Sequence, residues 1–304
     1  MSISKLRIGW WNTGLAPRTN SKKKKNGSDL ERATKIHTLA DLIAESFLNN
    51  GFDIFALGEV KPSDIDELQT ILRPPLRTFI DKDDDTGIAA FYKEDSVYVE
   101  STLALVDRYQ NKSLKRGYRL EFTTSDGSLS SYLFLCHWPS RMRGEQAARE
   151  RNELAIGLRN HILELRAGKM ALPVIVVGDF NDEPFDKSMS EHLLGSRDRS
   201  LVRKKDSLLY NPFWRHLGEQ QHIAEEGVGR KSRGSLFFAS DQLTNWLTVD
   251  QALVSVEFLG DNTWVLNEAE VGVIQPMELL NSEFDKIRLF DHLPIVLTLD
   301  RTNG

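Results

Sequence analysis

The chain has 304 residues, of which 40% are hydrophobic and 27% are charged, and its formal net charge is −5. This composition is ordinary for a globular protein, and the length allows one large α/β domain or two small ones. No run approaches the roughly eighteen apolar residues that a membrane span needs, which excludes a membrane-spanning role. The negative charge argues against a protein whose whole surface binds nucleic acid, although it allows a local basic groove.

One cysteine, Cys136, is present, so the chain cannot form an intrachain disulfide, and its first fifteen residues contain no apolar signal-peptide core. These features predict a protein of the reducing cytoplasm. Neither a shift in composition nor a long linker rich in Pro, Gly and Ser divides the sequence. We therefore expect a single domain over residues 1–304, and nothing in the sequence indicates an oligomeric state.

Apolar runs with strand character recur along the chain, and six of them carry a polar residue capable of chemistry at or beside one end. These stretches cover residues 6–12, 52–59, 132–137, 174–181, 246–250 and 291–297. Further strands are predicted at residues 86–92, 117–122 and 249–258, while much of residues 186–235 has the composition of loops. A polar residue at the end of one strand is common, but six such strand ends predict that their polar residues share one site.

Two helices are predicted between these strands. The first begins at the capping box Ser28-Asp-Leu-Glu31, repeats apolar residues at helical spacing and ends before Gly51. The second covers residues 145–166, with an apolar face of the same spacing, and ends before Gly168. Each helix connects one predicted strand to the next, whereas other strands follow one another directly. This mixture favours an α/β fold in which helices flank two packed sheets.

The polar residues of the six stretches are carboxylates, carboxamides and imidazoles, which are the groups that phosphate-ester cleavage requires. Cleavage needs neutralised charge on the non-bridging oxygens, an aligned water and a stabilised departing oxygen. Magnesium prefers oxygen ligands, so Asn12, Glu59 and Asp291 are suitable partners, whereas nothing supports a zinc site of cysteine and histidine. We expect Mg²⁺ as the cofactor, with Mn²⁺ as a substitute.

The most specific local motif is Gly178-Asp179-Phe180-Asn181. In a strand, Asp179 and Asn181 lie two residues apart and share a face, so both side chains can reach one water or phosphate oxygen. Gly178 would allow a neighbouring backbone to approach closely. The competing interpretation is an Asx-type turn after a buried strand, but that interpretation does not explain the other motifs.

Together these motifs resemble the endonuclease/exonuclease/phosphatase superfamily, which includes pancreatic-type deoxyribonuclease, abasic-site endonucleases, sphingomyelinases and inositol polyphosphate 5-phosphatases. The matching motifs run from Asn12 to His292 and so cover nearly the whole chain. The resemblance implies a four-layered α/β sandwich with two mixed central β-sheets flanked by helices, and a site on one rim of those sheets. It also makes Asn12 and Glu59 metal-site residues, with Asp291 completing the metal environment.

By the same matching, Asp179 orients or deprotonates the attacking water, and Asn181 positions it. The resemblance makes His137 and His292 contacts of the scissile phosphate, and Asp250 matches the aspartate that pairs with the final histidine. This pairing also has a physical basis, because a carboxylate bonded to one imidazole nitrogen fixes the tautomer and favours the cation. A cationic His292 would stabilise the pentacovalent phosphorus.

Two arginines are predicted to bind substrate. The motif His137-Trp-Pro-Ser-Arg141 resembles a bacterial-type branch of the superfamily, and Arg141 can hold a non-scissile phosphate or form a salt bridge to a helix. Arg116 occupies the strand start at which deoxyribonuclease-like members place a substrate-contacting arginine, with Arg119 as the alternative. Other basic residues gather at 22–25 and 141–151, where they either hold phosphates or lie on solvated surfaces.

The function that these motifs favour is a Mg²⁺-dependent phosphodiesterase, specifically a nuclease that hydrolyses DNA or RNA. The alternatives are a phosphatase, or a phosphodiesterase of phospholipids or small molecules, that uses the same site. The inositol 5-phosphatase version is disfavoured because its Pro-Ala-Trp-Cys-Asp-Arg motif is absent. A catalytically inactive binding module is a third alternative, but it requires lost ligands, and none of the eight central residues is lost.

Overall fold

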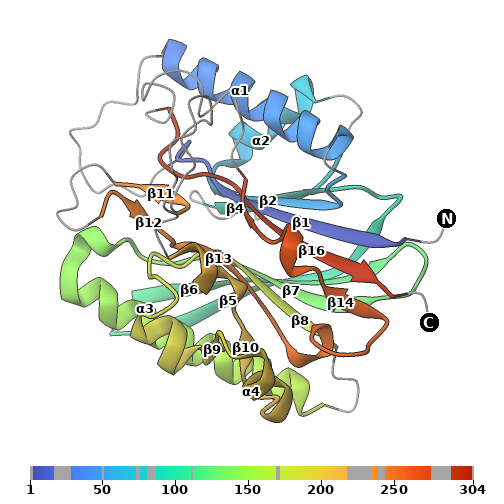
Figure 1. Ribbon diagram of the computed structural model, residues 1–304. Helices are drawn as coiled ribbons and strands as arrows, with labels where there is room; N and C mark the ends of the chain where they lie inside the picture. The colour runs from blue at the N-terminus through green and yellow to red at the C-terminus, as the bar shows by residue number, and fades with distance from the viewer. Residues whose placement is uncertain are drawn as a thin grey trace, which may run out of the picture.

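The computed structural model describes residues 3–16, 29–49, 51–72, 76–80, 87–110, 112–168, 172–217, 234–238, 244–274 and 289–302. In these residues the strands form two seven-stranded mixed sheets and a two-stranded ribbon. Helices cover the outer face of each large sheet, so the layers are helix, sheet, sheet and helix (Figure 1). This is the four-layered α/β sandwich predicted from the sequence.

The first large sheet, sheet A, has the strand order β14-β16-β1-β2-β4-β3, and β15 also pairs with β16. Its strands are β1 (Lys5–Asn12), β2 (Ile54–Val60), β3 (Arg77–Ile80), β4 (Gly87–Tyr92), β14 (Trp264–Leu266), β15 (Gly272–Val273) and β16 (Ile295–Arg301). β1 and β2 run parallel, with α1 (Asp29–Leu48) between them in the chain, and the other neighbours are antiparallel.

The second large sheet, sheet B, has the order β5-β6-β7-β8-β13-β10-β9. Its strands are β5 (Val97–Tyr109), β6 (Lys112–Thr124), β7 (Ser130–His137), β8 (Val174–Asp179), β9 (Gly195–Ser196), β10 (Leu209–Tyr210) and β13 (Asp250–Val254). β7 and β8 run parallel, with α3 (Gly144–Arg166) between them in the chain, and β13 is antiparallel to β8. The ribbon consists of β11 (Leu236–Phe237) and β12 (Trp246–Leu247).

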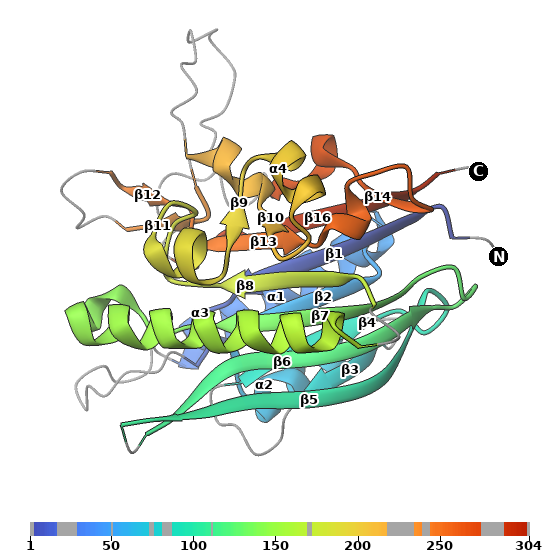
Figure 2. The same ribbon diagram turned by 90° about the horizontal axis from the view of Figure 1, so that it is seen from below.

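The helices lie on the outer faces of the sheets (Figure 2). α1 and α2 (Pro62–Ile71) bury their apolar sides against sheet A, and α3 buries its apolar side against sheet B. The shorter helical segments are α4 (Arg199–Lys204), η1 (Arg141–Arg143), η2 (Ser188–His192), η3 (Pro212–His216), η4 (Val256–Phe258) and η5 (Glu268–Glu270). Among the described helices, none has the length and apolar character to cross a membrane.

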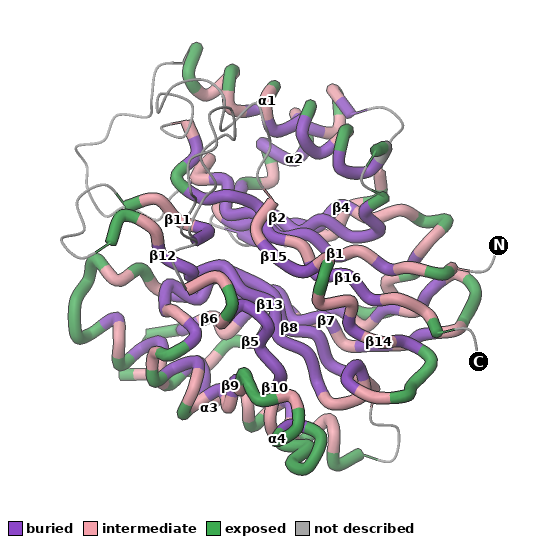
Figure 3. Tube along the Cα trace, viewed as in Figure 1, coloured by how far each residue is buried: buried purple, intermediate pink, exposed green. Residues whose placement is uncertain are grey.

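A continuous apolar cluster lies between the two sheets. The central strands of both sheets are accordingly mostly buried (Figure 3). Because successive side chains of a strand point to opposite faces, Ile8 and Trp10 of β1 enter this cluster, while Trp11 packs beneath α1. In β7, Leu133 and Leu135 face inward by the same rule. In four strands the inward position one step beyond the apolar residues is polar, namely Asn12, His137, Asp179 and Asp250.

Strand direction brings these four positions to one rim. The parallel pairs β1/β2 and β7/β8 end there, since Asn12 at the end of β1 contacts Asp179 at the end of β8. β13 is antiparallel to β8 and therefore begins at this rim, with Asp250 directly opposite Asp179. β16 is antiparallel to β1, so the segment that precedes it and carries Asp291 and His292 reaches the same edge.

Several element boundaries differ from the sequence prediction. Residues 246–250 contain β12 and the start of β13 rather than one strand, and the strand predicted over 249–258 ends at Val254. β16 begins at Ile295, directly after Pro294, which has no backbone N–H to donate to a sheet. The sequence prediction missed β5, an edge strand whose residues 100–104 are all exposed and therefore show no alternation.

We predict that Gly178→Ala destabilises the fold strongly. A Cβ atom at this position would lie 2.0 Å from the carbonyl oxygen of Cys136, which is backbone of the paired strand and cannot move aside. Overpacking of a core costs about 1–3 kcal/mol, and a clash with backbone is at the upper end or beyond. Gly260→Ala is the control, because its Cβ would meet its nearest neighbour at 3.7 Å. Urea unfolding of both variants tests the prediction, and equal stability would contradict it.

Candidate active site

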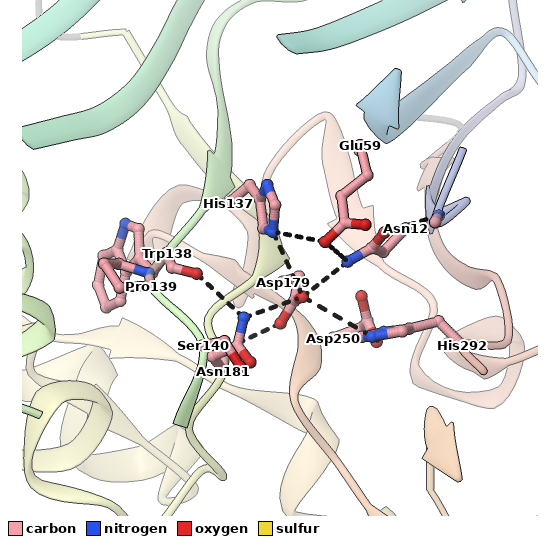
Figure 4. A network of polar contacts seen from close by, with 12 residues as sticks. Asn12, Glu59, His137, Trp138, Pro139, Ser140, Asp179, Asn181, Asp250 and His292 are labelled. Carbon is pink, nitrogen blue, oxygen red and sulfur yellow. Dashed lines mark hydrogen bonds and ion pairs between the residues drawn. The ribbon is translucent and has the colours of Figure 1, made fainter. Parts of the chain in front are cut away.

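Six polar side chains from both sheets meet at the rim described above (Figure 4). They are Asn12, Glu59, His137, Asp179, Asp250 and His292. β1 and β2 supply the first two, β7, β8 and β13 supply the next three, and the segment before β16 supplies the histidine. The structure therefore brings together residues that are separated by up to almost the full length of the chain.

Two carboxylates lie side by side at the centre of this group. Asp179 and Asp250 face one another across the β8–β13 pair and are 1% and 0% exposed. Like charges in such a cross-strand pair repel, and burial adds a desolvation cost. Donors from sheet A offset this cost: Asn12 Nδ2 donates to Asp179 Oδ2 at 2.9 Å, and Trp10 Nε1 donates to Asp250 Oδ1 at 2.8 Å.

His292 lies between the two carboxylates. Its Nδ1 is 2.7 Å from Asp250 Oδ2, and its Nε2 is 3.9 Å from Asp179 Oδ2. Burial by itself lowers the pKa of His292, but the charge and hydrogen bond of Asp250, with the charge of Asp179, raise that pKa well above its usual value. The imidazole is therefore a buried cation at neutral pH, and the Asp250–His292 contact is the pair that the sequence predicted.

Asp179 is held in a fixed orientation by Asn181. The backbone N–H of Asn181 donates to Asp179 Oδ1 at 2.8 Å, and its side-chain Nδ2 donates to Oδ2 at 3.1 Å. Asn181 adopts the left-handed backbone (φ +52°), which Asn tolerates better than most residues. Burial and the neighbouring charge of Asp250 raise the pKa of Asp179 to about 6, even though His292, His137 and Asn12 favour its anion.

Glu59 enters the cluster through a local irregularity of β2. The pairing of β2 with β4 shifts between Leu57 and Val60, and Glu59 has a φ of +55°, so a bulge turns its side chain toward the rim. Its Oε1 lies 3.4 Å from His137 Nε2 and 3.4 Å from Asn12 Nδ2. Burial raises the pKa of Glu59, but the contact with His137 and the charge of His292 outweigh it and leave the pKa lowered.

Asp291 lies at the margin of the cluster. Its side chain is exposed, and its Oδ1 is 3.7 Å from the point where a Cβ atom of Gly14 would stand. The backbone N–H of Gly14 donates to Asn12 Oδ1 at 3.2 Å, so Asp291 lies on the Asn12 side of the group. It is also close enough to His292 to help raise the pKa of that imidazole.

The structure does not bring Arg116 to the cluster. The pairing of β5 and β6 passes from Leu105–Gly117 to Val106–Lys115, which leaves Arg116 as the extra residue of a bulge and turns it to the outer face. There its Nε lies 2.7 Å from Asp107 Oδ2, and its Nη1 donates to the carbonyl of Gly157 on α3. Arg119, the alternative, lies on the same face over the ring of Tyr132.

Arg141 contacts the loop after β8 rather than open solvent. Its Nε donates to the carbonyl of Asn181 at 2.8 Å, and its Nη2 pairs with Asp186. The neighbouring arginines of residues 141–151 also pair with carboxylates, in the contacts Arg143–Glu150, Arg149–Glu145 and Arg151–Asp182. These arginines are therefore engaged within the protein, and the basic run 22–25 lies outside the described residues.

The donor set of the cluster fits a hard divalent cation. One oxygen of Asp179, one oxygen of Asp250 and one nitrogen of His292 all lie within 4.8 Å of one another. Asn12, Glu59 and Asp291, the metal residues expected from the sequence, add carboxamide and carboxylate oxygens beside this group. Such oxygen-rich groups suit Mg²⁺ or Mn²⁺. The one cysteine is buried on the opposite face of β7, among residues that pack on α3.

Sequence reasoning missed the roles of Trp10, Arg151 and Asp182. Trp10 is fully buried in the core, and its indole N–H is the donor from sheet A that holds Asp250. A signal was present, because a tryptophan at an inward strand position needs a hydrogen-bond acceptor. Arg151 and Asp182 form an ion pair behind the cluster.

The fold and this acid–imidazole cluster define a hydrolase of the two-sheet sandwich class. The sequence matches the Endonuclease/Exonuclease/phosphatase family over residues 19–283, and the chain belongs to that family. No curated protein sequence matches it significantly.

Solved structures with a similar fold differ in what they act on or bind. Bacteroides thetaiotaomicron mannosyl-6-phosphatase has 18% identity and a TM-score of 0.60, with 97% of this chain and 99% of that chain covered. The human Nocturnin catalytic domain with bound sulfate has 14% identity, a TM-score of 0.59 and coverages of 98% and 95%. D. rerio TDP2 complexed with single-strand DNA product has 17% identity, a TM-score of 0.61 and coverages of 98% and 100%.

We predict that Trp10→Phe destabilises the protein by about 1–3 kcal/mol more than loss of packing alone, because it leaves the buried Asp250 Oδ1 without its indole donor. Trp264→Phe is the matched control. Its ring lies in the same apolar cluster, but its N–H donates only to the part-buried Ser128 hydroxyl at 3.3 Å. Urea unfolding at neutral pH measures both variants, and equal losses would show that the indole N–H contributes nothing.

We also predict that Asp179 contributes stability to the metal-free protein that is lost as the pH rises from ~4 to ~7. The folded-state pKa of Asp179 is raised from 3.8 to about 6, so the native state binds this proton more tightly than the unfolded state does. The resulting stabilisation is complete below the unfolded pKa and is lost as the pH passes through the folded pKa. Asp179→Asn should flatten this slope, and added Mg²⁺ should stabilise wild type more at pH ~7 than at pH ~5. Identical slopes for the two proteins would refute the assignment.

Proposed function

We propose that this chain is a divalent-metal-dependent phosphodiesterase that hydrolyses nucleic acid, with Mg²⁺ as the ion and Mn²⁺ as a substitute. The observation that carries the proposal is the buried Asp179–Asp250 pair with His292 between the two carboxylates. The pair concentrates anionic oxygen that attracts a hard cation, and the imidazolium beside it suits the charge of a phosphate. Membership of the Endonuclease/Exonuclease/phosphatase family supports the same chemistry.

In this proposal, Asp179 orients the attacking water and accepts its proton. A pKa of about 6 keeps this carboxylate ionised at neutral pH and makes it a stronger base than an ordinary aspartate. Asn181 keeps Asp179 in orientation and shares the positioning of the water. His292, held as a cation by Asp250, and His137 stabilise the negative charge that develops on the non-bridging phosphate oxygens.

The residues proposed to hold the cation are Asn12, Glu59 and Asp291. Their carboxamide and carboxylate oxygens suit magnesium, and the lowered pKa of Glu59 keeps it anionic over a wide pH range. When bound, the ion supplies charge neutralisation for the phosphate and for the departing oxygen. The Asp179, Asp250 and His292 group could take the ion only with His292 deprotonated, so the cationic form of this imidazole favours the Asn12, Glu59 and Asp291 position.

Nucleic acid is proposed as the substrate because one structural neighbour, D. rerio TDP2, is complexed with single-strand DNA product. Arg141 is retained as a proposed phosphate contact, since its partly exposed guanidinium lies beside the loop of Asn181 and could exchange Asp186 for a substrate phosphate. Arg116 points toward α3 and is not part of the proposal.

A phosphatase of small phosphomonoesters is the second candidate. Its support is that Arg116 and the four arginines of residues 141–151 are each engaged by protein carboxylates, which leaves less free positive charge for a polymer backbone. One neighbour, the mannosyl-6-phosphatase of Bacteroides thetaiotaomicron, is named for such a reaction.

A substrate panel tests these two candidates against each other. Plasmid, linear duplex, single-stranded DNA, RNA, a small chromogenic diester and a sugar 6-phosphate are each incubated with EDTA, Mg²⁺ or Mn²⁺. Cleavage of a polymer only with the metal supports the nuclease, whereas release of phosphate from the monoester alone supports the phosphatase. A protein that cleaves none of them under any condition contradicts both.

We predict that Glu59→Gln, Asp179→Asn and His292→Ala each lower turnover by about two orders of magnitude or more, because each removes a positioned charge or base. His37→Ala is the control, since this histidine is exposed on α1 and is not one of the residues of the cluster. The folded fraction is measured by circular dichroism for each variant. Near-normal turnover of folded, metal-loaded His292→Ala would remove this histidine from the mechanism.

We further propose that residues 1–304 form one catalytic domain and that the protein acts in the cytoplasm. The first point is supported by the apolar cluster between the sheets, to which strands from both ends of the described chain contribute. The second is supported by the single, buried cysteine, which makes no disulfide.

A further inference from the structure

An ion pair lies directly behind the active-site cluster. Arg151, on the inner face of α3, places its Nε 2.8 Å from Asp182 Oδ2, and their side chains are only 5% and 9% exposed. The hydroxyl of Ser188 donates to the same carboxylate oxygen at 2.6 Å. Arg141 Nε lies 3.6 Å from the other oxygen, so Asp182 is surrounded by donors and charge.

The pair reaches three of the segments that carry the active site. Arg151 Nη1 donates at 2.9 Å to the carbonyl of Pro139, which follows His137 by two residues. Asp182 directly follows Asn181, and its own carbonyl accepts a bond of 2.6 Å from the side chain of Gln251. Gln251 is the neighbour of Asp250 in β13, so the ends of β7 and β8 and the start of β13 are connected through these contacts.

Arginine suits this position for a geometric reason. Its planar guanidinium can contact the carboxylate of Asp182 and the carbonyl of Pro139 at the same time, whereas a lysine ammonium is a single point of charge on a flexible stem. A buried pair of this kind adds little net stability over apolar residues, but it fixes the partners to one arrangement. We therefore expect the ion pair to act on the geometry of the site rather than on the stability of the fold.

We propose that Arg151 and Asp182 are positioning residues: they hold the His137 loop and the Asp179–Asn181 loop at the separation that the reaction requires. This inference rests on the proposed phosphoester hydrolysis, in which these loops act on one phosphate. Neither residue touches the reacting atoms. Their effect is transmitted through Pro139, through the link from Asp182 to Asn181, and through Gln251.

The test compares Arg151→Lys and Asp182→Asn with the matched control Arg166→Lys. Arg166 lies on the same helix and pairs with Glu257 at 2.8 Å, with 11% of its side chain exposed, but it lies at the opposite end of α3. Steady-state kinetics use whichever substrate of the panel the wild type cleaves, and urea unfolding gives the stability of each variant. Displaced catalytic groups should lower kcat by about 10- to 100-fold with KM within about threefold.

Arg166→Lys should lose a similar amount of stability but keep its kcat. The double variant Arg151→Lys/Asp182→Asn should fall no further than the more severe single variant, because residues that act as one unit are not additive. A normal kcat in Arg151→Lys, or a loss of kcat equal to that of Arg166→Lys, would overturn the proposal.

Hydrogen exchange provides a readout that does not depend on activity. The amide of Trp138 donates to the carbonyl of Asp179 at 2.9 Å, and the amide of Asn181 donates to its carboxylate. Both amides should exchange at least tenfold faster in Arg151→Lys and remain unchanged in Arg166→Lys. Faster exchange in a protein whose wild type cleaves nothing would reject the proposed function but keep the positioning role. Unchanged exchange would reject the positioning role alone.

Discussion

Two buried aspartates, Asp179 and Asp250, face each other at the ends of adjacent strands. Their negative charges repel, and the other side chains of the site are placed so that they offset this repulsion. Sheet B itself supplies His137, 3.9 Å from Asp179 Oδ2, and the two donors of Asn181, which all act on Asp179. Sheet A adds the amide of Asn12, the indole of Trp10, and His292 from the segment before β16, and the last two of these act on Asp250. Because Asp250 depends on groups from the opposite sheet, the site is complete only while the two sheets are packed together.

The apolar layer between the sheets therefore sets the geometry of the candidate site as well as the stability of the fold. The inward residues of β1 and β7 set the spacing between the sheets. The polar residue at the next inward position of each strand is held at the same spacing. The 2.9 Å bond between Asn12 and Asp179 crosses from one sheet to the other and depends on this register. A change in core volume should consequently disturb the site before it unfolds the chain.

Much of this arrangement could be predicted from the sequence. Side chains alternate between the two faces of a strand, so the apolar residues of a strand show which polar residue at its end also faces inward. Alternation cannot predict its own interruptions. The bulge at Arg116 reverses the side of β6 on which that arginine lies, and the bulge at Glu59 brings its carboxylate inward. A glycine adjoins each bulge, Gly117 and Gly58, and such a glycine marks a bulge in a strand without fixing which side chain it turns. Arg151 could have been recognised, because it lies at helical spacing from the buried Leu154 and Leu158, and a charge at such a position requires a partner.

The antiparallel pairing of β8 with β13 has an evolutionary consequence. The chain leaves the site after Asp179 and returns to it at Asp250, and a backbone hydrogen bond of 3.0 Å from Phe180 to Val249 closes the excursion at its base. Within this stretch, Asn181, Asp182 and Ser235 contact the site, so these positions are constrained along with the two anchors. The remaining residues of the excursion can be lengthened, shortened or replaced while the cluster at its base keeps its shape.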